Sequence, residues 1–196
     1  MKDKKIVQFV GILGLVCVGV LIIFFVLNQK SEDGIFVKKE NTSTEVQNIL
    51  EKDIERNYPA TVREVVRLFS RISKCYYNES ISETEFEQLL LLQRQLFDEE
   101  FLNYNPLESF ANNLSLELEV IKKEKHTMIS YRVQKQSSVT TWQSGENNFS
   151  SIIAGYTLKE GSEYKKTYEE FLLREDENGR WKIVGWRLTA PIEIEE

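Results

Sequence analysis

Few residues in this chain of 196 have side chains that carry catalytic or metal-binding chemistry. There is one histidine, His126, and there are two cysteines, Cys17 and Cys75. A structural zinc ion takes about four Cys or His ligands, so this composition excludes such a site. The sequence also lacks a glycine-rich phosphate loop and the Gly-x-Ser-x-Gly motif of a nucleophilic serine. We therefore expect neither a metal ion nor a cofactor.

The histidine and the clustered carboxylates are poor candidates for acid–base catalysis. His126 falls at the junction of a predicted helix and a predicted strand, whereas a general base must reach its substrate inside a water-poor pocket. Asp98, Glu99 and Glu100 are consecutive on a predicted helix, so their side chains point in different directions. We expect these three, and the strand pair Glu169-Glu170, to be surface charges. No catalytic residue is predicted.

Aromatic side chains offer a second kind of candidate site. Six of them are distributed over the predicted sheet, namely Tyr131, Trp142, Tyr156, Tyr168, Trp181 and Trp186. The favoured interpretation is that they pack in the core and as cross-strand pairs. The alternative is that some of them line a cavity for an apolar or glycan ligand. In that case the candidates for the cavity wall are Tyr131, Tyr156 and Trp186.

An apolar run at residues 6–27 predicts a transmembrane helix, since Gln8 is its one strongly polar residue. A helix of this length spans about 33 Å, and the hydrocarbon core of a bilayer is about 30 Å thick. A cleaved signal peptide would have a shorter apolar region followed by small residues. Lysines at positions 2, 4 and 5 precede the run, which predicts a cytoplasmic N-terminus and an extracytoplasmic location for residues 28–196.

The charge balance argues against nucleic acid as a partner. The chain has 25 basic and 31 acidic residues, a net charge of −6. Three lysines and one aspartate precede the apolar run, so residues 28–196 carry 22 basic and 30 acidic residues, a net charge of −8. Nucleic acid phosphates would repel such a domain. The membrane, through residues 6–27, is the one partner that the composition predicts directly.

The outer part divides into a polar stalk, a folded domain and an acidic tail. The five predicted parts of the chain are a basic tail at 1–5, the transmembrane helix at 6–27, the stalk at 28–57, the domain at 58–190 and the acidic tail at 191–196. Within the stalk, residues 45–56 carry an apolar stripe at helical spacing. This short helix packs on the domain, pairs with another copy or stays solvated; the sequence leaves the choice open.

The domain changes from a helical to an extended pattern near residue 125. Apolar residues three and four apart predict helices over about 60–77, 83–103 and 106–123. Alternating residues then predict strands over about 128–133, 139–142, 149–158, 164–174 and 181–188. The dipeptide Asn178-Gly179 indicates a hairpin before the last strand. Three helices followed by four to five antiparallel strands predict an α+β fold, with the helices on one face of the sheet.

This order of elements, ending in the run Gly179-Arg180-Trp181-Lys182-Ile183-Val184-Gly185-Trp186, resembles the nuclear transport factor 2-like (cystatin-like) superfold. More closely, residues 58–66, 96–98, 173–176 and 179–186 resemble a clostridial-type family of single-pass membrane proteins of unassigned function. The resemblance covers about residues 57–190. It implies that the sheet curves around the helices as a cone outside the membrane. It implies no catalytic residues.

The leading hypothesis is a non-catalytic domain for interaction or assembly, anchored in the cell membrane and facing outward. Its partner would be another copy of the chain or a member of a membrane complex. The alternative is the binding of a small molecule or glycan in the cone. A third hypothesis, a degenerate hydrolase or isomerase, requires a buried polar pair or a carboxylate of raised pKa. The sequence analysis identifies no such pair.

An uncleaved anchor predicts that the full-length chain stays with the membrane fraction and withstands extraction with alkaline carbonate. Immunoblots of the membrane, soluble and medium fractions of cells that express the chain measure this. A chain with residues 6–27 removed is the control, because it has lost the apolar run. Mature protein free in the medium would contradict the prediction.

Overall fold

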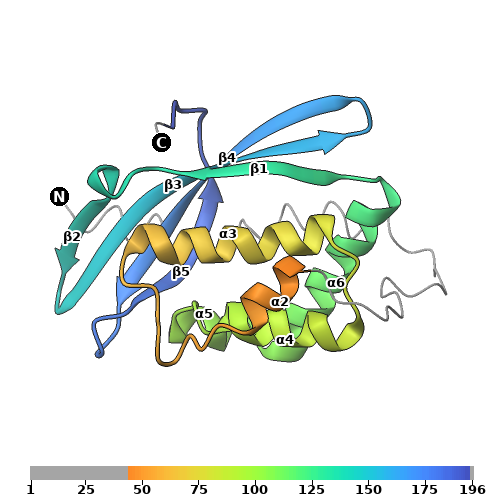
Figure 1. Cartoon of the computed structure of the whole chain (residues 1–196). Coiled ribbons are helices and arrows are strands. Elements are labelled where there is room, and N and C mark those ends of the chain that lie inside the picture. The colour runs from red at the N-terminus through yellow and green to blue at the C-terminus, as the bar shows by residue number, and fades with distance from the viewer. Residues whose placement is uncertain (1–43, 195–196) are drawn as a thin grey trace. The chain divides into compact units, whose positions relative to one another are not determined.

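The computed structural model describes residues 44–194, which belong to one compact unit of the chain (Figure 1). The predicted basic tail, the transmembrane helix at 6–27 and the first part of the predicted stalk lie outside the described residues. Among the helices of residues 44–194, none has both the length and the apolar character needed to cross a membrane.

Among the helices, α3 (Val62–Asn78) makes the most extensive contact with the sheet, where it lies against β1, β3 and β5. Thr61 caps this helix. Its side chain accepts the amide of Glu64, and the Glu64 carboxylate accepts the amide of Thr61 in return. This capping box satisfies amides that have no partner within the helix. Val65 and Ile72 of this helix are fully buried.

A short helix, α2 (Thr44–Leu50), packs on α4 and α3. Val46 and Ile49 are buried, and Arg71 Nη2 of α3 donates to Glu45 Oε2 at 2.9 Å. The apolar stripe that the sequence analysis found at residues 45–56 therefore packs on the domain. The helix ends at Leu50. Ile54, in the loop that follows, is also buried.

The prediction of one helix over 83–103 is wrong, because the structure has two helices there with a break between them. They are α4 (Glu83–Arg94) and α5 (Glu99–Tyr104). In the break, the Asp98 amide donates to Ile183 O at 2.9 Å and the Ile183 amide donates to Leu96 O at 2.8 Å. These bonds to a distant strand replace the helical ones. A further helix, α6 (Leu107–Lys123), matches the predicted third helix closely.

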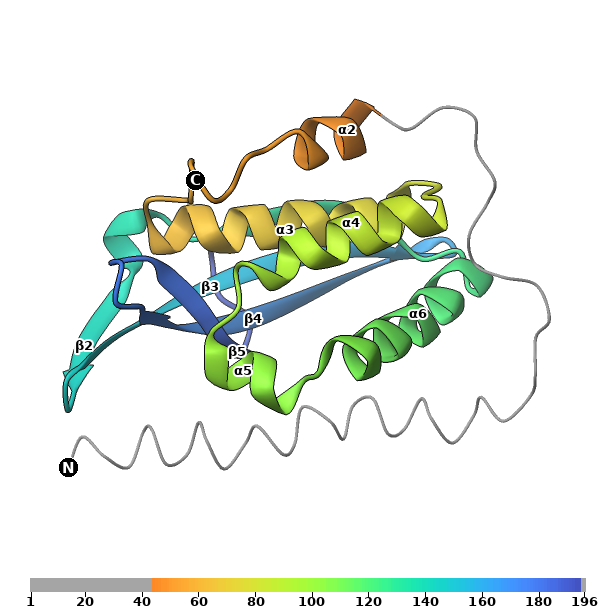
Figure 2. The ribbon, with the colours of Figure 1, turned by 90° about the horizontal axis from the view of Figure 1, so that it is seen from below.

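Five strands form one antiparallel sheet, as the α+β prediction requires. They are β1 (Thr127–Val133), β2 (Thr140–Ser144), β3 (Asn147–Glu160), β4 (Glu163–Glu175) and β5 (Trp181–Leu188), and the 3-10 turn η1 (Gln136–Ser138) joins the first two. The order is β1-β3-β4-β5, and β2 pairs with the opposite end of β3 from β1. The helices lie on one face of the sheet (Figures 1 and 2). Within residues 44–194 there are five α-helices, where three were predicted.

Six aromatic rings fill the space where α3, α5 and α6 meet β4 and β5. These rings are hereafter the aromatic cluster, and they belong to Phe69, Phe97, Phe101, Phe110, Phe171 and Trp186. Phe69 of α3 contacts both strands, with ring centroids 5.0 Å from Trp186 and 5.2 Å from Phe171. Tilted and edge-on contacts at these distances are the favourable arrangements for aromatic pairs. The cluster therefore joins the helical layer to the sheet.

An ion pair between Asp98 and Arg174 connects the break to β4. Arg174 Nε donates to Asp98 Oδ2 at 3.0 Å, and Arg174 Nη2 donates to the other carboxylate oxygen. Asp98 also caps α5 by accepting the Glu100 amide at 2.9 Å. The expectation that Asp98 is a surface charge is wrong, because only 4% of it is exposed. Glu99 and Glu100 are exposed, as expected.

We expect Asp98→Ala to destabilise the fold by about 2–4 kcal/mol, since it removes a helix cap and leaves Arg174 without its carboxylate. Urea unfolding of the full-length chain in detergent, followed by tryptophan fluorescence, measures the change. Glu100→Gln is the matched control. Glu100 is exposed and lies 3.5 Å from Arg174 Nη1, so its loss costs less than about 1 kcal/mol. Equal stability of the two variants would contradict this account.

Candidate functional site

Two of the three predicted cavity residues lie together. Tyr131 of β1 pairs in register with Tyr156 of β3. The Tyr156 ring is buried, and its hydroxyl lies 3.0 Å from Oγ of Ser70 on α3. Burial raises the pKa of both tyrosines, so both phenols are neutral at physiological pH. Trp186, the third predicted residue, belongs to the aromatic cluster instead.

Two carboxylates, Glu169 of β4 and Glu117 of α6, interact electrostatically, and Glu169 is half-buried rather than the surface charge expected from the sequence. Glu169 and Phe171 are two residues apart in β4, so their side chains lie on the same face of the sheet. Phe171 contacts Phe69 of α3, and Glu169 therefore faces the helices. Burial, and to a lesser degree the charge of Glu117 on α6, raise the pKa of Glu169 to about 7. The surrounding protein also raises the pKa of Glu117, although its side chain reaches the surface.

Two tyrosines share this environment with the carboxylates. The phenol of Tyr77 on α3 has a raised pKa, chiefly from burial and then from the charges of Glu117 and Glu169. The charge of Glu169 acts on Tyr156 in the same direction. The four side chains thus form one electrostatically connected group, hereafter the acidic group: Tyr77, Glu117, Tyr156 and Glu169.

The pattern of the sequence does contain a signal for Glu169. Glu169 is two residues before Phe171, so the alternation of β4 places it on the core side. Glu117 is three residues after Leu114 and four before Ile121 in α6. The alternation of β4 therefore indicates from the sequence that Glu169 points inward, whereas Glu117 is exposed beside the apolar stripe of α6. The sequence cannot show that Glu117 lies within electrostatic reach of Glu169.

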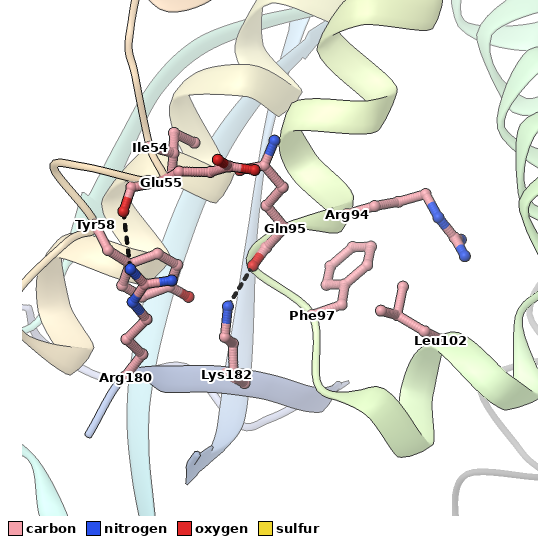
Figure 3. Close-up of a pocket in the computed structure, with 9 residues that line it drawn as sticks. All are labelled: Ile54, Glu55, Tyr58, Arg94, Gln95, Phe97, Leu102, Arg180 and Lys182. Carbon is pink, nitrogen blue, oxygen red and sulfur yellow. Dashed lines mark hydrogen bonds between the residues drawn. The ribbon is translucent and has the colours of Figure 1, made fainter. Parts of the chain in front are cut away.

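A separate pocket of about 320 Å³ opens between the loop before α3, the break after α4 and the start of β5 (Figure 3). Its lining residues are Ile54, Glu55, Tyr58, Arg94, Gln95, Phe97, Leu102, Arg180 and Lys182. None of the three predicted cavity residues is among them. The sequence analysis assigned no role to this set, because its members come from three distant stretches of the chain.

Two cationic side chains in this pocket form cation–π contacts with the same aromatic ring. Lys182 Nζ lies 4.2 Å and the Arg180 guanidinium carbon 5.2 Å from the centroid of the Tyr58 ring. Such contacts hold a cation in place without neutralising it. The Tyr58 hydroxyl donates to Trp181 O at 2.8 Å, which fixes the ring. Burial lowers the pKa of Lys182, and the charge of Asp176 opposes this effect in part.

Each of these cations gives one hydrogen bond to a backbone carbonyl. Lys182 Nζ donates to Gln95 O at 2.7 Å, and Arg180 Nη2 donates to Glu55 O at 2.8 Å (Figure 3). Within the described part of the chain, no carboxylate forms an ion pair with either cation. An ammonium group has three N–H donors and a guanidinium group has five, so both retain donors for a ligand.

The opposite wall of the pocket is apolar. Phe97 is buried and Leu102 is half-buried beside it, while Ile54, also buried, lies next to Glu55 and Tyr58 (Figure 3). Arg94 also lines the pocket, but its guanidinium group points away from Lys182 (Figure 3). It donates to Asn105 O at 2.8 Å and lies 5.7 Å from the centroid of the Phe110 ring. The pocket therefore has a cationic side and an apolar side.

Metal-binding groups do not gather within residues 44–194, where no cluster of three or more His, Cys, Asp or Glu side chains could hold an ion. His126 lies between α6 and β1, at the predicted junction. Its Nε2 atom is 3.1 Å from Glu124 Oε2. The histidine thus contacts a neighbouring carboxylate on the same turn of chain and is not part of the acidic group or the pocket.

Comparison with known families places the chain in one of them. The model of a family described as a domain of unknown function, DUF6715, matches residues 1–186, so the chain belongs to this family. A search among curated proteins finds no match. The family match starts at residue 1, so it includes the apolar run at 6–27 as well as the folded domain.

We expect Glu169→Gln to stabilise the protein at pH 8 and to leave its stability at pH 4 almost unchanged. The pKa of this carboxyl is about 7 in the folded state against an ordinary value of 4.5. The folded state therefore binds the proton more tightly, and stability falls as the pH rises from about 4.5 to about 7. Glutamine removes this loss, worth about 2 kcal/mol at pH 8 because part of the side chain reaches solvent.

Urea unfolding of the full-length chain at the two pH values measures the effect. Glu163→Gln is the control, since Glu163 is an exposed residue of the same strand. It should change stability equally at both pH values. A Glu169→Gln variant that is less stable than the parent chain at pH 8 would show that the carboxylate is needed in its charged form.

Proposed function

We propose that this member of the DUF6715 family is a membrane-anchored extracytoplasmic domain that acts by binding an anionic group of a ligand or partner. The observation that carries the proposal is the pair of cations, Lys182 and Arg180, on the Tyr58 ring. Within residues 44–194 they have no carboxylate partner, and they border a pocket with an apolar side. Partly desolvated cations attract anions more strongly than fully hydrated ones do.

The location rests on the first part of the sequence. The apolar run at 6–27 and the three lysines before it support an anchor with a cytoplasmic N-terminus. The family match covers this run and the domain together, which supports their acting as one unit. A domain held at the membrane surface meets partners that share the membrane. The proposed partner is therefore a protein of a membrane complex or another copy of the chain, and nucleic acid is disfavoured by the net charge of −8 outside the run.

A binding role without catalysis is supported by the contacts of two side chains that could carry acid–base chemistry, because both are engaged with neighbouring residues. Asp98 caps α5 and pairs with Arg174, and His126 contacts Glu124. These residues stabilise the fold in the arrangement observed. The earlier alternative, a small molecule or glycan held by Tyr131, Tyr156 and Trp186, has less support, because Trp186 packs on four phenylalanine rings.

A second candidate function is proton transfer at the acidic group. Glu169 has a pKa of about 7, which suits a general base at neutral pH, and Tyr77 and Tyr156 lie within its electrostatic reach. This is the feature that the hydrolase or isomerase hypothesis required. It favours that hypothesis only if a substrate reaches Glu169, whereas the basic pocket is open to solvent in the arrangement described.

Binding at the pocket predicts that simple anions stabilise the full-length chain in lipid nanodiscs. At constant ionic strength, replacing chloride by acetate or phosphate should raise the melting temperature by about 2–4 °C at ten times the dissociation constant. Thermal unfolding followed by tryptophan fluorescence measures the shift. The effect should disappear in Lys182→Met and persist in the control Lys166→Met, an exposed lysine of β4. Equal shifts in both variants would refute the pocket as the site.

A further inference from the structure

The pocket's charged and apolar sides together restrict its ligand more than the proposed function requires. The volume, about 320 Å³, lies at the small end of the range for ligand pockets, about 300–1,000 Å³. It suits one small molecule or one residue of a chain. An extended anionic polymer would meet the cations but leave the apolar side unfilled.

The donors fit an anion with a single negative charge. Lys182 and Arg180 lie on the same side of the pocket and retain donors after bonding to Gln95 O and Glu55 O. Acidic groups are also near. Asp176 acts electrostatically on Lys182, and Glu55 lines the pocket. These carboxylates offset part of the attraction of the two cations, so a ligand with one negative charge is favoured over a ligand with two.

Within the described residues, the carboxylate of Asp176 forms hydrogen bonds within the turn and no ion pair with Lys182 or Arg180, although its charge acts on Lys182. Its Oδ1 atom accepts the amides of Asn178 and Arg180, both at 2.9 Å, in the turn before β5. Arg180 thus receives support at its backbone from Asp176, while its side chain extends over Tyr58. The turn positions the guanidinium group and does not pair with it.

The apolar side requires a hydrocarbon group on the same ligand. Ile54, Phe97 and Leu102 come from the loop before α3, the break and α5, and all three border the pocket that Lys182 enters (Figure 3). Burying an aliphatic side chain against them contributes about 25 cal/mol per Å² of apolar surface removed from water. Acetate or phosphate cannot use this wall.

From these points, and on the basis of the proposed function, we infer that the pocket binds an apolar monocarboxylate. Lys182 and Arg180 hold the carboxylate, while Ile54, Phe97 and Leu102 contact its hydrocarbon group. A free acid with one aliphatic or aromatic group has this chemistry, and so does the C-terminal residue of a peptide. The two sources differ in one group: in a C-terminal residue an amide nitrogen is bonded to the carbon next to the carboxylate, and in the free acid it is not.

The test uses the full-length chain in lipid nanodiscs and four probes, with affinities from calorimetric titration or thermal unfolding. N-acetylleucine mimics a C-terminal residue, 4-methylpentanoate is the matching free acid, N-acetylleucinamide lacks the charge, and acetate lacks the hydrocarbon group. We expect one or both apolar acids to bind about tenfold more tightly than the amide, which lacks a charge-assisted hydrogen bond worth about 1.5–3 kcal/mol. The same acids should bind about tenfold more tightly than acetate, which buries no hydrocarbon group. The tighter of the two acids identifies the source.

Two variants separate the sides of the pocket. Lys182→Met should weaken both apolar acids about tenfold, whereas Leu102→Ala should weaken them several-fold and leave acetate unchanged. Lys166→Met, away from the pocket, should change neither. Circular dichroism of each variant shows whether it has folded. If Lys182→Met is unfolded, Lys182→Arg replaces it, and an unchanged preference for acid over amide is expected, because the charge is kept.

The outcomes distinguish this inference from the proposed function on which it rests. If acetate or phosphate binds as tightly as the apolar acids, the inference fails while anion binding stands. If the amide binds as tightly as the acids, the inference fails because charge makes no contribution. If no anion, phosphate included, stabilises the full-length chain, both the inference and the proposed function fail.

Discussion

The break between α4 and α5 is the constraint on which most of the domain depends. Two backbone hydrogen bonds to Ile183 and the pairing of Asp98 with Arg174 hold this segment against β4 and β5. It ends one helix, begins the next and inserts Phe97 into the aromatic cluster. It also brings Gln95 O within 2.7 Å of Lys182 Nζ. The core and the pocket therefore share one support.

In the interior of the domain, α3 makes apolar contacts with some residues and polar contacts with others. Phe69 of α3 belongs to the aromatic cluster, whereas Ser70 and Tyr77 of that helix approach Tyr156 and the charge of Glu169. Packing of rings fixes the helix on the sheet at low cost. The polar contacts are more expensive, since an inward carboxylate loses hydration, and the raised pKa of Glu169 is the result. A fold that keeps such a group gains a feature that responds to pH near neutrality.

The pocket lies outside this interior and uses other physics. Its cations keep their charge because the Tyr58 ring and two backbone carbonyls, rather than carboxylates, hold them in position. The apolar side is supplied by residues that are already part of the core, such as Phe97 and Ile54. Because the same side chains stabilise the fold and border the pocket, the shape of the pocket is set before any ligand arrives. Preorganisation of this kind lowers the entropic cost of binding.

The sequence by itself determined the elements and their order. The change of period near residue 125, the capping boxes at Thr61 and Ser82 and the Gly179 turn are local signals, and the structure places helices, strands and a hairpin there. Only the tertiary structure decided where the predicted helix breaks, since the Asp98 amide donates to Ile183 O and the Ile183 amide to Leu96 O, across 85 residues or more of chain. It also decided that the charge of Glu117 acts on Glu169 and that the Tyr58 ring contacts Lys182. Periodicity shows which face of an element is turned inward, but it cannot show what that face meets, because the meeting residues lie far apart in the chain.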